Sequence, residues 1–169
     1  MPDSQTHSTY VIRNIRRDEL PMILDVQQNA YAPHLLEHLA TFERRYEMYS
    51  AGFMGAFHSE QLAGYSISFP WYSDVPIALD QPESDGSRLF DCYYMHDVAV
   101  MPEHRGHGIA DKFVNNCFDD ARHHGLGTIR MVTVQGGQHI WSRYGFAIDG
   151  LAHESYGADA YKMFLHLNP

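Results

Sequence analysis

The sequence has little of what marks a disulfide-stabilised, membrane-spanning or nucleic-acid-binding protein. Only two of its 169 residues are cysteines, Cys92 and Cys117, too few for a disulfide framework. No apolar run approaches the roughly 18 residues that a bilayer-spanning helix needs. Twelve lysines and arginines face 21 acidic residues, and a net charge of -9 argues against binding a polymer of phosphates. We therefore expect no membrane and no nucleic acid among its partners.

Signals of targeting and of internal division are also missing. Residues 1–8 are polar, unlike a secretory signal peptide, so the cytoplasm is the expected compartment. The chain shows no repeat, no low-complexity segment and no linker. With 44% hydrophobic residues, residues 1–169 are expected to form one domain with a full core. The sequence leaves a homodimer open.

The most informative stretch is residues 93–110, which read YYMHDVAVMPEHRGHGIA. Its first half is almost wholly apolar or aromatic, a pattern that predicts a strand covered on both faces. Apolar residues at helical spacing then predict a helix over residues 109–121. Between them, Gly106 and Gly108 allow close backbone approach, and Arg105 adds a positive charge. This strand, basic turn and helix N-terminus predict a phosphate cradle.

The spacing of this turn narrows the choice of phosphate ligand. A dinucleotide-binding fingerprint would need a small residue where Asp111 stands, and a mononucleotide P-loop would need Gly-Lys-Ser/Thr. The sequence instead has Arg105-x-x-Gly108-x-Ala110, preceded by the Val-Ala-Val of residues 98–100. This pattern resembles the acetyl-coenzyme A binding motif of the GNAT superfamily of N-acetyltransferases.

The resemblance extends downstream and implies a fold. A strand over residues 128–134 is followed by a short helix over residues 138–144 and then by Gly145-Phe146, as in the family. The implied fold is α/β, with a GNAT-like mixed, mostly antiparallel sheet of about seven strands that splays beside residues 93–101 and carries helices on both faces. Upstream, we expect a second helix over residues 34–49.

The implied function is that of an enzyme, an N-acetyltransferase that moves an acetyl group from acetyl-CoA to the amine of a small molecule by direct attack. Acetyl-CoA is the expected cosubstrate, and no metal is expected. The residues expected to hold the donor are Val98, Ala99, Val100, Arg105, Gly106, His107, Gly108, Ile109, Ala110, Gln135 and Trp141.

His96 is the predicted catalytic base, because an imidazole can relay a proton at neutral pH. Its position matches a histidine of the arylalkylamine N-acetyltransferases, although a buried histidine can also be a core residue. On a regular strand His96 shares a face with Tyr94 and Val98, while Asp97 points the opposite way, as a structural or orienting carboxylate or a second choice of base.

The family commonly has a tyrosine as general acid where this chain has Trp141, four residues before Gly145. An indole N–H is a donor without accessible acidity, so Trp141 can pack on the thioester or bond its sulfur but cannot protonate it. Tyr144 could replace the missing acid only if the short helix is rotated. Water or direct release of the thiolate is the alternative.

The acceptor pocket is expected to use residues from the second helix, its entry, the start of the irregular insertion and the strand over residues 93–101. These are Tyr31, His34, Glu37, Trp71 and Tyr94. The irregular insertion over residues 71–89 contains Asp74, Asp80, Glu83 and Asp85, which could draw in an amine; a solvated excursion is the alternative. The aromatic residues favour an aromatic or apolar amine and the acidic balance favours a polyamine, so both stay open.

Two other functions compete with this reading. Trp141 in place of tyrosine would also suit a non-catalytic acyl-CoA-binding module. Residues 34–38 read His-Leu-Leu-Glu-His, and on a helix His34 and His38 would lie one turn apart, as in a zinc hydrolase that also uses Glu37. Twelve histidines in the chain make a chance match of this short motif unsurprising.

Overall fold

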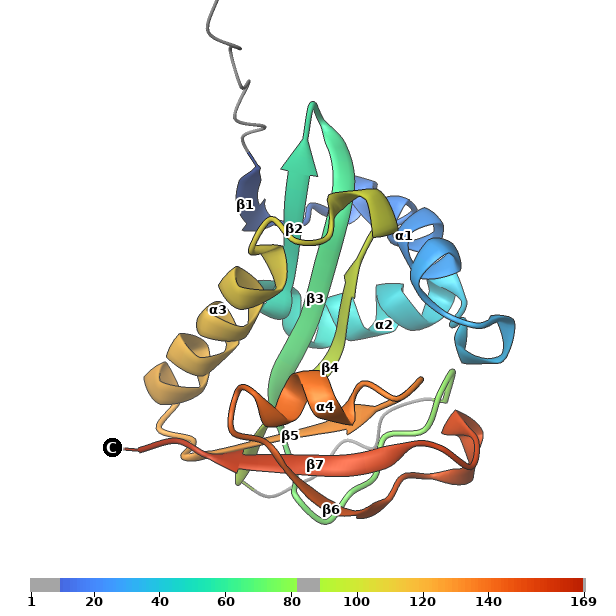
Figure 1. The fold of residues 1–169 in the computed structure, drawn as a ribbon. Helices are drawn as coiled ribbons and strands as arrows, with labels where there is room; N and C mark the ends of the chain where they lie inside the picture. Colours follow the sequence, from blue (N-terminus) through green and yellow to red (C-terminus); the bar gives the residue numbers. More distant parts are fainter. Residues whose placement is uncertain (1–9, 82–88, 169) are drawn as a thin grey trace, which may run out of the picture.

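The computed structural model describes residues 10–81 and 89–168, and the strands of this part form one seven-stranded sheet (Figure 1). The strands are β1 (Val11–Asn14), β2 (Phe53–His58), β3 (Gln61–Trp71), β4 (Cys92–Val100), β5 (Thr128–Thr133), β6 (Ala147–Leu151) and β7 (Tyr161–His166). Their order is β1-β2-β3-β4-β5-β7-β6. All neighbours are antiparallel except β4 and β5, which are parallel. The predicted mixed, mostly antiparallel sheet is therefore confirmed.

Helices cover both faces of this sheet, as predicted (Figure 1). The α-helices are α1 (Met22–Ala30), α2 (Leu39–Tyr49), α3 (Ile109–His123) and α4 (Gln138–Ser142). Short 3-10 turns are η1 (Arg17–Glu19), η2 (Pro33–Leu35), η3 (Ser50–Gly52), η4 (Pro102–His104) and η5 (Glu154–Tyr156). α1 and α2 lie on one face and α3 lies on the other. The long strands β3 and β4 are consequently buried between helices, as the apolar run of β4 predicts.

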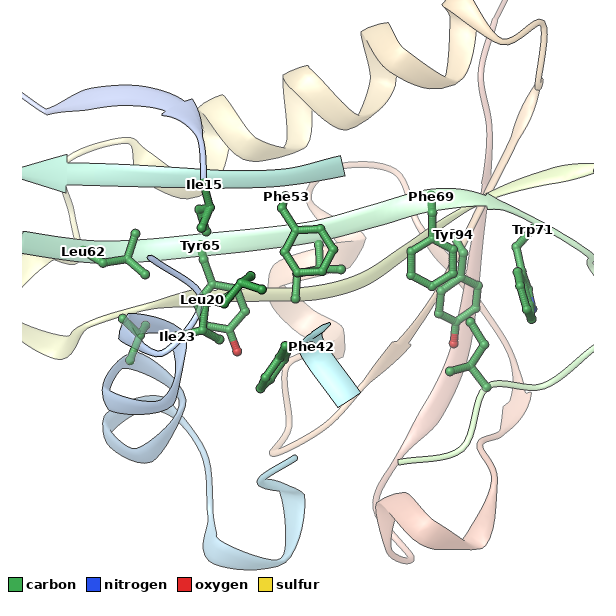
Figure 2. Close-up of a cluster of buried hydrophobic side chains, with 14 of the residues drawn as sticks. Ile15, Leu20, Ile23, Phe42, Phe53, Leu62, Tyr65, Phe69, Trp71 and Tyr94 are labelled. Atoms are coloured by element: carbon green, nitrogen blue, oxygen red, sulfur yellow. The ribbon is translucent and has the colours of Figure 1, made fainter. Parts of the chain in front are cut away.

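The larger core lies between the sheet and the helices α1 and α2. Figure 2 shows Phe53, Tyr65 and Phe69 extending from β2 and β3 toward the side where Ile23 of α1 and Phe42 of α2 lie. All five are fully buried. Burying each such large apolar side chain contributes about 1.5–3 kcal/mol, so this cluster fixes α1 and α2 on the sheet. A second cluster joins α3 to the opposite face.

The sheet splits between β4 and β5. The two strands pair only at Tyr93 with Ile129 and at Tyr94 with Arg130. β5 then pairs along its whole length with β7, whereas β4 follows β3 to Val100. In Figure 1, β5 and β7 therefore run across the direction of β2 and β3. The predicted splay is confirmed, and in the described part of the chain it leaves one edge of β4 without a partner strand beyond Tyr94.

The helix predicted over residues 34–49 is wrong at its start, because α2 begins only after His38. The side chain of Gln27 occupies both backbone groups of Glu37: Nε2 donates to Glu37 O at 2.7 Å, and Oε1 accepts from Glu37 N at 3.1 Å. The amide of His38 donates to Asp80 Oδ1 at 3.0 Å. These backbone groups are therefore not free to make the hydrogen bonds of a continuous helix.

Two predictions fall wholly or partly outside the described residues: the polar start over residues 1–8, and Glu83 and Asp85 of the insertion. The described ends of the insertion are held together at their base. There, Ser73 donates through its amide and its hydroxyl to the carboxylate of Asp91, at 2.7 and 2.8 Å. In residues 10–81 and 89–168, no helix has the length and apolar character that crossing a membrane requires.

Candidate functional site

A cleft of about 810 Å³ opens where β4 and β5 diverge. β4 and β5 form its walls, and the first turn of α3 closes one end. The other end is formed by the segment after α1 together with the loops before β4 and β7. Residues of this second end are Tyr31, Leu35, Glu37, Leu79 and Tyr156. The cleft therefore joins a glycine-rich basic turn to a pocket lined by tyrosines and leucines.

Most of the sequence-predicted site residues line this one cleft. From the catalytic and donor sets these are His96, Asp97, Val98, Ala99, Val100, Arg105, Gly106, Gly108, Ile109, Ala110, Gln135, Trp141 and Tyr144. From the acceptor set, Tyr31 and Glu37 line it. Residues separated by more than 100 positions in the chain are thus brought to one opening.

Four predicted site residues do not line the cleft. Trp71 is 2% exposed, and its indole N–H donates to a backbone carbonyl at 2.9 Å. Tyr94 is buried, with its ring stacked on His96 at a centroid distance of 6.2 Å. His34 lies beside the loop before β7, and His107 Nδ1 contacts the carbonyls of the basic turn. These residues can support the lining, but they do not form it.

The basic turn presents backbone amides at one end of the cleft. Gly106 and Gly108 have φ values of +79° and +72°, a region that favours glycine. Gly108 is also the N-cap of α3, and no side chain of residues 10–81 or 89–168 caps the start of the helix. Arg105 is anchored by a hydrogen bond from Nε to Val100 O at 3.1 Å. Free helix-terminal amides beside a guanidinium form a site suited to an anion such as a phosphate.

A β-bulge in β4 overturns the predicted orientation of Asp97. Ile67 of β3 pairs with Asp97 and Ser68 pairs with Met95, so His96 is an extra residue in the ladder. His96 contacts Glu37, and Asp97 contacts Tyr65, both on the α1 and α2 side. The two side chains therefore share a face. Val98 packs instead toward α3, so the prediction that it shares a face with His96 is also wrong.

The same bulge exposes backbone rather than side chain to the cleft. The side chain of His96 is only 2% exposed, yet the residue as a whole is half-buried. Asp97 and Val98 are also half-buried, and all three line the cleft. Peptide groups of this strand edge can therefore bond an amide-bearing ligand as an added strand would, or stabilise an oxyanion.

Asp97 is held by two tyrosine hydroxyls. Tyr31 donates to Oδ1 and Tyr65 donates to Oδ2, each at 2.5 Å. Tyr31 also lies 3.0 Å from Val98 O, but its single hydroxyl hydrogen serves one acceptor at a time. Burial raises the pKa of Asp97 despite these bonds, and burial together with the charge of Asp97 raises the pKa of both tyrosines.

Glu37, Arg45 and His96 form a buried cluster behind the bulge. Arg45 binds Glu37 through two hydrogen bonds, at 2.6 and 3.0 Å, and its Nη1 lies 2.7 Å from His96 Nε2. His96 Nε2 is 3.0 Å from Glu37 Oε2, and the amide of Asp80 donates to Glu37 Oε1 at 2.8 Å. Burial opposes ionisation of Glu37, but His96 and Arg45 outweigh it and hold the pKa of this carboxyl well below its usual range.

Arg45 is a site residue that sequence reasoning missed. Its spacing from Phe42, Tyr46 and Tyr49 puts a cation on the apolar face of α2, and this was the available signal. Tyr156 and Thr133 were missed as well. Both are buried and line the cleft, and their hydroxyls have no hydrogen-bond partner among the described residues. A lone tyrosine in a polar turn and a strand threonine carry no such signal.

Trp141 and Tyr144 lie together on the α4 side of the cleft, with ring centroids 5.8 Å apart. The hydroxyl of Tyr144 donates to Asp111 in the first turn of α3. Burial and, to a smaller extent, this hydrogen bond raise the pKa of Tyr144 to about 12. Its proton is therefore engaged by Asp111 and released less readily than that of an ordinary tyrosine.

Gln135 connects the two walls near the acceptor end. Its side chain accepts from Ala32 N at 2.7 Å and donates to Ala30 O at 3.2 Å. The backbone of Gln135 has a φ of +54°, which is uncommon for a residue other than glycine. Gln135 thereby fixes the segment that contains Tyr31.

The zinc-like motif does not have the geometry that its interpretation requires. His34 lies in η2 and His38 precedes α2, so the two histidines do not share a helical face. His38 Nδ1 contacts Asp80, while Glu37 binds Arg45. Within the described ranges, no three His, Cys, Asp or Glu side chains are grouped so that they could hold a metal ion.

Comparisons with known proteins agree with this geometry. The model of the Acetyltransferase (GNAT) family matches residues 11–146. No curated protein matches the chain. Among solved structures, the loading GNATL domain of CurA from Lyngbya majuscula is 12% identical with a TM-score of 0.76, and the match covers 94% of this chain and 98% of that one.

Two further structures are an N-acetyltransferase and a complex that contains a peptide and CoA. The ribosomal-protein-S18-alanine N-acetyltransferase from Escherichia coli is 14% identical with a TM-score of 0.67, and covers 95% of this chain and 96% of that one. The NatC complex bound to Gag peptide and CoA contains a chain that is 17% identical, with a TM-score of 0.70 and coverage of 94% and 99%. At these identities the likeness is one of fold.

Proposed function

Because the chain belongs to the Acetyltransferase (GNAT) family, we propose that it transfers an acetyl group from acetyl-CoA to the primary amine of a small molecule. One observation supports this proposal above the others: a strand edge with exposed peptide groups and an uncapped helix N-terminus line the same cleft. A ligand that has amide groups along an arm and a pyrophosphate at its end matches both features.

The residues that would hold the donor follow from these features. Val98 to Val100 would bond the amides of the arm, and Arg105 with the amides after Gly108 would bond the pyrophosphate. Thr133 offers a buried hydroxyl on the opposite wall, without a partner in the described part of the chain. Acetyl-CoA supplies a thioester, whose C–S bond breaks as the amine nitrogen forms the new C–N bond and the sulfur leaves as a thiolate.

The chain itself would supply proton transfer and charge stabilisation. His96 lines the cleft, and its buried Nδ1 has no hydrogen-bond partner among the described residues, which supports this nitrogen as acceptor of the amine proton. A peptide N–H of the bulge would stabilise the carbonyl oxygen. The indole N–H of Trp141 would donate to the departing sulfur, and water would supply its proton, because the hydroxyl of Tyr144 is engaged by Asp111.

The lining of the acceptor end supports an amine with one positive charge and a compact apolar body. Leu35 and Leu79 supply apolar surface there, next to Tyr156. Among the described residues, the three carboxylates that line the cleft are bound internally, Glu37 by Arg45, Asp97 by two tyrosines and Asp111 by Tyr144. A polyamine would need a carboxylate for a second ammonium, so we propose a monoamine acceptor.

The α-amine of a peptide is the second candidate acceptor. Two structurally similar proteins, one bound to Gag peptide and one acting on the alanine of a ribosomal protein, favour it. Two contacts across the acceptor end argue for the smaller substrate. Leu79 N donates to Ser155 Oγ at 3.1 Å, and His34 lies beside Gly157, so three loops meet there.

The test measures release of free CoA thiol, with product mass as confirmation. The purified protein is incubated with acetyl-CoA and, separately, with phenethylamine, hexylamine, spermidine and a short unblocked peptide. We expect the monoamines to be acetylated fastest. If the peptide is acetylated fastest, the proposed acceptor changes from a monoamine to a peptide. If no thiol is released in response to any amine, the proposed function is overturned.

A matched pair of arginine variants tests the donor site. Arg105→Ala is expected to raise the KM for acetyl-CoA about tenfold or more, because a charge-assisted phosphate contact contributes about 1.5–3 kcal/mol. Arg122→Ala, at the exposed far end of α3, is the control and should leave this KM unchanged. Equal KM values in the two variants would remove the pyrophosphate assignment.

A further inference from the structure

We infer that Glu37 and Arg45 compete for one nitrogen of His96, and that Glu37 is the positioning residue that makes the other nitrogen a proton acceptor. The inference rests on the proposed function, because it assigns a cause to the base role of His96. It starts from three atoms that lie within 3.0 Å of one another: Arg45 Nη1, Glu37 Oε2 and His96 Nε2.

The two contacts of His96 Nε2 exclude each other. An arginine guanidinium is always protonated, so the 2.7 Å contact with Arg45 requires a lone pair on Nε2. The 3.0 Å contact with Glu37 is a hydrogen bond only if Nε2 has a hydrogen, since an ionised carboxylate only accepts. A neutral imidazole has one hydrogen, on one nitrogen or the other, so one contact is made at a time.

The choice at Nε2 fixes the chemistry at Nδ1. When Nε2 accepts from Arg45, the hydrogen sits on Nδ1, which can then only donate. When Nε2 donates to Glu37, Nδ1 has a free lone pair and can accept the proton of an amine. Nδ1 is buried and has no hydrogen-bond partner among the described residues, so no contact of that nitrogen settles its state.

Because the cluster is buried, the choice between the two contacts depends strongly on the charges around it. The side chains of Glu37, Arg45 and His96 are 3%, 0% and 2% exposed, so water does not screen their charges. The groups that face the imidazole are Glu37 from the segment before α2, Arg45 from α2, Tyr94 and Asp97 from β4, and the ring of Phe69 from β3. Glu37 is itself held by the amide of Asp80. Among the residues that the structure describes, Glu37 and Arg45 are the charged groups within hydrogen-bond distance of the imidazole.

The first experiment reads the tautomer directly and needs no acceptor substrate. Long-range proton–nitrogen spectra report which imidazole nitrogen bears hydrogen, and loss of one signal set in His96→Gln assigns His96 among the twelve histidines. Glu37→Gln should move His96 toward the form with hydrogen on Nδ1. Arg45→Met should move it toward the form with hydrogen on Nε2. Spectra of His96 that are unchanged in both variants would overturn the inference.

The second experiment reads turnover against pH, using the amine that the wild-type protein acetylates best. Glu37→Gln should lower kcat at least tenfold and leave the KM for acetyl-CoA within twofold. Arg45→Met should shift the acidic limb of the pH profile to higher pH, because removing the neighbouring positive charge favours the protonated imidazole. Arg45→Lys, which retains a cation, should keep the wild-type limb. If the cluster were merely structural, the variants would lower the fraction of active enzyme and leave the acidic limb of the pH profile in place, and that result would overturn the inference.

A double variant covers the case in which a single substitution prevents folding. Glu37→Met with Arg45→Met removes both charges together and keeps the site apolar. Its His96 should lose the wild-type preference for one nitrogen, and retention of that preference would overturn the inference. Absence of turnover in the wild-type protein would instead overturn the proposed function, and the tautomer measurements would remain interpretable.

Discussion

Replacing Arg45 by methionine leaves a buried carboxylate without its cation, and the structure indicates how large the loss is. The Arg45 side chain is fully buried and gives Glu37 hydrogen bonds of 2.6 and 3.0 Å. Removing one partner of such a pair costs about 3–5 kcal/mol, because the remaining charge stays desolvated. A chain of this size loses about 2–4 °C of Tm for each kcal/mol, so we expect Tm to fall by about 6–20 °C.

The pH dependence gives this prediction its sign. In the wild-type protein the pKa of Glu37 is lowered, so its stabilisation is fully present above the unfolded value of about 4.3 and is lost only as the pH falls below it. In Arg45→Met, burial without a cation raises the pKa of Glu37 above that value. The folded variant then binds a proton more readily than the unfolded chain. Its deficit should therefore be largest at neutral pH and shrink as the pH approaches about 5.

Urea unfolding at pH 7.5 and pH 5.0 measures both effects. The double variant Glu37→Met with Arg45→Met is the matched comparison, and it should recover most of the lost free energy of unfolding at both pH values. A loss below about 1 kcal/mol, or an equal loss at the two pH values, would refute the reasoning that this pair is an ionised, desolvated unit.

Two further predictions concern stability rather than catalysis. The hydrogen bond from Arg13 lowers the pKa of Glu19 to about 2, so its contribution is present above about pH 4.3 and lost as the pH falls toward 2. Glu19→Gln should lower the free energy of unfolding, measured with urea, by about 1–2 kcal/mol at pH 7, since Arg13 is partly exposed. The loss should be much smaller at pH 2.5, and an equal loss at the two pH values would contradict the ion pair. Gly52→Ala should lower the free energy of unfolding by about 3 kcal/mol, because a Cβ there would lie 1.6 Å from Ser68 O. At Gly106 a Cβ would meet open space, so Gly106→Ala should lower the free energy of unfolding by only about 1 kcal/mol, the cost of its φ of +79°. Equal Tm losses for the two glycine variants would contradict the packing argument.

The parts of the fold that sequence reasoning predicted well are those that depend on neighbours in the chain. The apolar run of β4, the helical spacing of α3 and the glycines between them are local patterns, and each corresponds to one element of the structure. The start of α2 was misjudged because Gln27 and Asp80, both distant in sequence, take the backbone groups of residues 37 and 38.

The sequence by itself determined that a strand leads through a basic glycine turn into a helix, because backbone sterics and hydrophobic period act over a few residues. Only the tertiary structure decided which side chains meet at the cleft. The bulge at His96 arises from the register of β4 against β3, and it turns two successive side chains to one face. The contact of Arg45 with Glu37 and His96 requires α2 to pack on the sheet. Such contacts depend on register and packing between segments far apart in the chain, which no local pattern encodes.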